Sequence, residues 1–161
     1  MTAPVFPFAG LLIAHDAAAT DATRLSELAR TLADAGASPV VVALSPDAAA
    51  PPGARVVRTR THGSAIAAMR LGMAQLTNTV ARAVLLVPLH AEPASLVTLL
   101  ALVDAAKRDE QAMIAFSNAD LDESAVLLPR DGWLELVTVG EGGMNAVAAR
   151  RRVMRVSAEP G

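Results

Sequence analysis

A chain of 161 residues is long enough for one ordinary domain, which buries about 70% of the surface that its unfolded chain exposes. The composition is 53% hydrophobic and 19% charged, which excludes a disordered tail and a membrane protein. With 14 basic and 16 acidic residues the net charge is -2, so we expect no nucleic-acid partner. Cysteine is absent, which excludes disulfides, thiolate zinc sites and cysteine nucleophiles. The amino terminus lacks a basic segment, so we expect a cytoplasmic protein without a signal peptide or membrane partner.

The first strand and helix are predicted from hydrophobic spacing. Residues 8–14 form a continuous apolar run, which is typical of a strand buried on both faces. In residues 22–35 apolar side chains recur at three- and four-residue spacing, which predicts a helix. Thr20 or Asp21 is the expected N-cap, and Gly36 stands where a helix commonly ends.

The rest of the chain continues to alternate between apolar, β-branched runs and helical patterns, two of which follow serine N-caps at Ser64 and Ser95. This alternation predicts a three-layer α/β/α, Rossmann-like domain over residues 1–161, with a mostly parallel sheet. In chain order the remaining expected elements are a strand at 39–45, a loop at 46–53, a strand at 55–59, a helix from 64 to about 76, a strand at 83–89, a helix after Ser95, a strand at 112–116, an acidic loop at 118–123, a strand at 125–128, a helix or strand at 133–137, a helix at 142–149 and a strand at 153–156.

Candidate ligand-binding residues follow from this topology, because ligands of open parallel sheets bind at the carboxyl ends of the strands. All three histidines lie near predicted strand-to-helix transitions. The expected crevice is bordered by Ala14, His15, His62, Gly63, Ser64 and His90. Asp16, Glu92 and Asn118 lie at the same edge.

Two interpretations remain open for these residues. Neutral imidazoles bind divalent metals and Glu92 or Asp16 adds a carboxylate, so His90 and Glu92 are candidate metal ligands. The alternative is loop histidines bonded to backbone or water, because no short-range metal spacing is present. Gly63 and Ser64 either begin a helix as a plain cap or present backbone N–H groups to an anion.

Other polar segments carry weaker signals. The loop 15–21 has no glycine or lysine, so it matches neither the P-loop nor the dinucleotide-binding fingerprint. The acidic loop is either solvated or binds a cation, and arginines 150–152 are either a solvated helix end or an interface or anion site. No nucleophile-elbow signature is present, so we assign no catalytic residue.

Several strings together resemble the MobA-like nucleotidyltransferases, the family of molybdopterin guanylyl- and cytidylyltransferases. The similarity lies in GLLIA, the first strand, in the Gly/Ser-led helix GSAIAAMRLG, in the strand segment VLLVPLHAEP and in the glycine-rich turn GEGGMN. The resemblance implies a nucleotidyltransferase fold, with nucleotide phosphates held at the first loop and a metal held by an aspartate before a proline.

The chain departs from that pattern where the family binds phosphate and metal. The family's first loop is glycine-rich and followed by lysine, whereas residues 14–24 here carry Arg24 as their one cation. His90 aligns with the metal-binding aspartate, and Ala91 and Glu92 stand before Pro93. The family's later Asp-rich segment would fall beyond Ala158. Because magnesium prefers oxygen ligands, these changes weaken a two-carboxylate magnesium site.

We therefore expect a degenerate MobA-like protein without efficient transferase activity, which binds a nucleotide, another small ligand, a protein partner or a second copy of itself. One alternative is an active molybdopterin-type nucleotidyltransferase that uses CTP or GTP and a divergent metal site at His90 and Glu92. Another is a structural or regulatory subunit. Magnesium is expected only if activity is retained, and no other cofactor is assigned.

Overall fold

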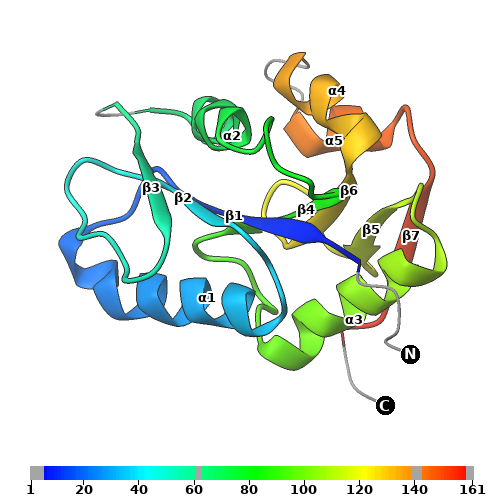
Figure 1. Cartoon of the computed structure of the whole chain (residues 1–161), viewed down its shortest axis with the longest axis horizontal. Coiled ribbons are helices and arrows are strands. Elements are labelled where there is room, and N and C mark those ends of the chain that lie inside the picture. Colours follow the sequence, from blue (N-terminus) through cyan, green and yellow to red (C-terminus); the bar gives the residue numbers. More distant parts are fainter. Residues whose placement is uncertain (1–5, 61–62, 139–142, 159–161) are drawn as a thin grey trace.

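The computed structural model describes residues 6–60, 63–138 and 143–158. Seven strands in these residues form one sheet in the order β3-β2-β1-β4-β6-β5-β7 (Figure 1). The strands are β1 Phe8–Ala14, β2 Val40–Leu44, β3 Arg55–Arg58, β4 Ala83–Pro88, β5 Met113–Phe116, β6 Val126–Pro129 and β7 Val153–Val156. The α-helices are α1 Ala22–Asp34, α2 Ala65–Ala74, α3 Leu96–Arg108, α4 Trp133–Thr138 and α5 Gly143–Ala148.

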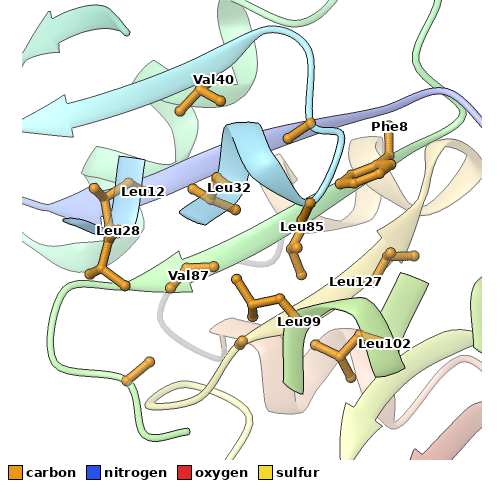
Figure 2. Close-up of a cluster of buried hydrophobic side chains, with 14 of the residues drawn as sticks. Phe8, Leu12, Leu28, Leu32, Val40, Leu85, Val87, Leu99, Leu102 and Leu127 are labelled. Carbon is orange, nitrogen blue, oxygen red and sulfur yellow. The ribbon is translucent and has the colours of Figure 1, made fainter. Parts of the chain in front are cut away.

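Helices cover both faces of the sheet, which confirms the three-layer prediction. Helices α1 and α3 lie on one side, and α2, α4 and α5 lie on the other (Figure 1). Successive strand residues point to opposite faces, so Leu12 packs in the α1 and α3 layer while Leu11 packs in the α2 layer. Figure 2 shows the first of these cores, where Leu28 and Leu99 approach the sheet from their helices. Burial on both faces explains the continuous apolar run in β1.

The sheet is parallel except at β6, which pairs antiparallel with both β4 and β5. The segment 117–125 between β5 and β6 contains no helix. It is too short for the crossover of about a dozen residues or more that a parallel connection needs. The chain therefore returns beside β5 in the opposite direction, and β7 then pairs parallel with β5.

The expected helix caps are confirmed at two serines, whereas Asp21 occupies the N-cap position of α1 without a side-chain cap hydrogen bond. The Oγ atom of Ser64 accepts the Ala67 N–H at 3.1 Å, and Ser95 accepts the Thr98 N–H at 3.3 Å. Asp21 is the residue before α1, but its carboxylate accepts the N–H of Ala18 at 2.8 Å. Its side chain thus closes the short 3-10 turn that precedes α1 and leaves α1 without a side-chain cap.

Two expectations for the last third of the chain are decided by packing. Residues 133–137 lie in helix α4, because Trp133 and Leu136 pack on the sheet through one helical face. The solvated helix end expected at arginines 150–152 is wrong for Arg151, whose side chain is only 12% exposed and pairs with Asp131 and Glu135. Long-range contacts of this kind leave no local pattern in the sequence. Position 142, part of the last expected helix, lies outside the described residues.

Within the described residues, no helix has both the length and the apolar character needed to cross a membrane.

Candidate functional site

A cavity of about 950 Å³ opens at the carboxyl ends of β1, β4 and β5. Its walls come from the loops that follow these strands and from helices α2 and α5. The volume lies in the range of about 300–1,000 Å³ that is usual for small-molecule sites. The cavity therefore occupies the edge of the sheet at which the topology predicts a ligand.

The inner wall of the cavity is apolar. Most of this wall lies on the α2 and α5 face of the sheet, where Ile13 of β1 and Leu86 of β4 point. Leu89 and Phe116, which pack in the α1 and α3 layer, complete it at the edge of the sheet. The buried apolar lining residues are Ile13, Met69, Leu86, Leu89, Phe116, Leu121, Val126 and Met144. An apolar wall of this extent fits an organic body.

The mouth of the cavity is acidic. Five exposed carboxylates line it, and no arginine or lysine is among the described residues that do so. The carboxylates belong to Asp16, Glu92, Asp120, Asp122 and Glu123. With His15 and His90 neutral, the lining carries a formal charge of -5 from these five side chains.

His90 and Asp16 meet across the loops that follow β4 and β1. The His90 Nε2 atom lies 3.7 Å from the Asp16 Oδ2 atom, and both side chains are more than half exposed. The loops are held together by the Leu89 N–H, which donates to the Ile13 carbonyl at 2.9 Å. Within the described residues, no group of three or more histidine and carboxylate side chains is arranged to hold a metal ion.

Arg24, the one cation of the first loop region, is bonded away from the cavity. Its Nε atom donates to the carbonyl of Leu89 at 3.2 Å, and its Nη2 atom donates to the carbonyl of Ala91 at 2.9 Å. Both residues lie in the loop that carries His90. The guanidinium therefore braces the β4–α3 loop from the start of α1.

The structure brings together five of the residues expected at this edge of the sheet. His15, Asp16, His90, Glu92 and Asn118 all line the cavity, whereas Gly63 and Ser64 do not. Ser64 begins α2 as its cap, and the next residues of that helix reach the wall instead. His62 lies outside the described residues.

Ala14 is also absent from the cavity lining. It is fully buried and packs in the α1 and α3 layer, on the opposite face of the sheet from Ile13. The alternation of side chains along β1 therefore sends it away from the ligand side.

Sequence reasoning underestimated the segment 117–124, every residue of which lines the cavity. Asn118 follows β5 and has a φ of +61°, a left-handed conformation that asparagine tolerates better than most residues. Asp122 accepts the Met144 N–H at 2.8 Å and the Asn145 side-chain amide at 2.6 Å, which ties this wall to α5. Asp122 is therefore more than part of a solvated loop, and its pairing with residues far along the chain has no local signal.

Comparison with known proteins identifies the fold. No protein-family description matches the sequence, and no curated protein matches it. Solved structures do match. Rv0371c from Mycobacterium tuberculosis H37Rv, in a complex with manganese, is 16% identical and has a TM-score of 0.68 over 94% of this chain and 88% of that one.

Two further matches carry functional names. A nucleotidyl transferase from Methanothermobacter is 13% identical with a TM-score of 0.68, over 96% of this chain and 88% of that one. A 4-diphosphocytidyl-2C-methyl-D-erythritol synthase is 14% identical with a TM-score of 0.69, over 96% and 90%. The chain has a nucleotidyltransferase-like α/β fold. This confirms the fold implied by the sequence resemblance.

Proposed function

We propose that this protein is a degenerate MobA-like member of the nucleotidyltransferase fold that lacks efficient transferase activity and uses its cavity to bind a small ligand. The observation that carries the proposal is the charge of the cavity, with five carboxylates and no arginine or lysine among its described lining residues. The cavity volume of about 950 Å³ supports the binding of a small molecule.

Phosphoryl transfer depends on cations that position the phosphates and neutralise developing charge. Two like charges 4 Å apart near a protein surface repel by roughly 4 kcal/mol at an effective dielectric constant of 20. A triphosphate at this mouth meets carboxylates from three loops. Arg24 does not offset them, because its guanidinium is bonded to two backbone carbonyls.

One alternative has an observation in its favour. Asp16, His90 and Glu92 share the mouth of the cavity, and carboxylates together with imidazole are ligands for a divalent cation. An active enzyme would hold its metal there and neutralise part of the negative charge. Against this alternative, the described residues contain no ready-made set of three such ligands.

The test is a transferase assay with CTP or GTP, magnesium or manganese, and a molybdopterin acceptor, read as pyrophosphate release. We expect no release above a protein-free control. Metal-dependent release at a typical enzymatic rate, about 1 per second or faster, would overturn the proposal. Loss of that release in Glu92→Gln, but not in Glu27→Gln on the exposed side of α1, would then assign the activity to this mouth.

A further inference from the structure

The two halves of the cavity differ in chemistry, and the difference restricts the ligand. The inner wall is formed by buried side chains such as Met69, Phe116 and Met144. The mouth is formed by exposed carboxylates on loops from two sides, the β1 and β4 ends and the β5–β6 segment. A ligand that matches both halves has an apolar body and a polar, positively charged end.

The negative charge at the mouth is only partly compensated inside the protein. Within the described residues, the carboxylates of Glu92 and Glu123 have no hydrogen-bond or ion-pair partner. Asp120 accepts the Asp122 N–H at 2.9 Å, a bond that leaves its charge in place. Asp122 is bonded to neutral donors of α5. Asp16 faces His90 at 3.7 Å, too far for a direct hydrogen bond.

His15 adds a second, independent indication of a ligand. It lines the cavity, and its Nδ1 atom is buried without a hydrogen-bond partner in the described structure. Buried polar atoms in native proteins normally have partners, so each exception requires an explanation. Because this atom is closed off from the cavity, an N–H group of a bound molecule reaches it only if the imidazole ring turns, and it then supplies the partner when the ring proton is on Nε2.

We propose that the cavity binds an organic cation, an amine with an apolar body, with its ammonium group at the carboxylate mouth. This inference rests on the proposed ligand-binding function and names the chemical class of the ligand. The carboxylates attract an ammonium group and repel phosphates, while the apolar wall contributes through burial of the ligand's hydrocarbon part. A nucleotide satisfies neither requirement at its phosphate end.

The experiment compares three probes that share one body and differ in charge: 4-phenylbutylamine, 4-phenylbutanol and 4-phenylbutyrate. Calorimetric titration at low salt measures each Kd. We expect the amine to bind at least tenfold more tightly than the alcohol, and the carboxylate to bind most weakly. Added salt should weaken binding of the amine and leave that of the alcohol nearly unchanged, because salt screens exposed charges.

The position of the bound probe is read from the methionine methyl groups by NMR. Met69 and Met144 line the cavity, whereas Met73, Met113 and Met154 do not. We expect the amine to shift the Met69 and Met144 signals first and most strongly. Assignments follow from single Met→Leu variants.

Two variants with the same change of net charge separate local from general electrostatics. E92Q/E123Q removes two carboxylates from the mouth, and E27Q/D47N removes two exposed carboxylates that do not line the cavity. We expect the first variant to weaken amine binding about tenfold or more and the second to change it less than twofold.

The outcomes are distinguishable from failure of the proposed function. If the alcohol binds in the cavity as tightly as the amine, the cation inference is overturned, but the cavity remains a small-ligand site. If both double variants weaken amine binding equally, the cation inference is also overturned and the small-ligand site again remains. If no probe shifts Met69 or Met144, the cation inference is likewise overturned, and pyrophosphate release in the transferase assay decides separately whether the protein is an enzyme.

Discussion

Replacement of Arg24 by methionine tests whether this arginine braces the site or remains free for another role. Its guanidinium donates to the carbonyls of Leu89 and Ala91, residues that are 1% and 0% exposed. Methionine keeps the aliphatic packing and the helix propensity but removes both hydrogen bonds. We therefore expect Arg24→Met to lower the free energy of unfolding and to loosen the loop that carries His90.

The magnitude follows from the two carbonyl acceptors. A buried acceptor that loses its partner costs about 1–3 kcal/mol, and bonds from a charged donor lie at the upper end of net hydrogen-bond contributions. Two such losses give roughly 2–6 kcal/mol. His90, between the two carbonyls, is 66% exposed, so water can reach part of this loop. We accordingly expect a loss of about 2–3 kcal/mol, in the lower part of the range.

Arg30 provides a matched control on the same helix. Its side chain is 85% exposed, and its Nε atom lies 3.9 Å from the Asp34 carboxylate. An exposed pair of this kind contributes roughly 0–1 kcal/mol, so Arg30→Met should cost less than about 0.5 kcal/mol. Urea unfolding of both variants gives the midpoint and the slope m of the free energy against urea concentration. If the slopes are equal, the midpoints can be compared directly as a measure of stability. If Arg24→Met is no less stable than Arg30→Met, the proposed brace is refuted.

Two further substitutions test the packing around the site, both by urea unfolding. Gly72→Ala should destabilise the protein by about 1 kcal/mol, because the new Cβ overlaps the Leu11 side chain. The cost of this overlap exceeds the gain in helix propensity. In a Leu11→Ala background, where the overlap is absent, the same change should become stabilising. Arg151→Met should lower the free energy of unfolding by about 2 kcal/mol, less than the loss of a fully buried ion pair, because the partner Asp131 is 68% exposed. Arg152→Met is the control: its side chain is 65% exposed, so the loss should be under about 1 kcal/mol. If the two arginine variants lose the same stability, the expected difference between the buried Arg151 and the exposed Arg152 is refuted.

The fold was predictable because its signals are local. Strand β1 is a continuous apolar run because it is buried on both faces, and α1 has apolar residues at three- and four-residue spacing because one face of the helix is buried. Strand β6 shows the limit of this reasoning. Its apolar sequence is compatible with either direction, and its antiparallel pairing follows from the length of the preceding segment and the position of its partners.

The candidate site was predictable only where it follows parallel strands. His15 and His90 follow β1 and β4, which pair in parallel, so the two loops reach the same edge. The sequence does not show on which face of the sheet the cavity lies. Ile13 and Ala14 point to opposite faces, and the structure places Ile13, not Ala14, in the cavity lining. The wall at 117–124 depends on the return of β6 beside β4, a contact between distant parts of the chain.

Under the proposed function, the charges that oppose phosphate binding are distributed over several loops, so no single substitution removes them. The carboxylates at the mouth come from three separate loops, and Arg24, which the first loop region retains, is committed to the backbone of one of them. Replacing a single carboxylate by lysine leaves four carboxylates of the original five facing a triphosphate. Freeing Arg24 removes the bonds that hold the His90 loop in place. If the proposed function is correct, a transferase activity at this site would require coordinated changes in several loops, whereas binding of a cation uses the carboxylates that already line the mouth.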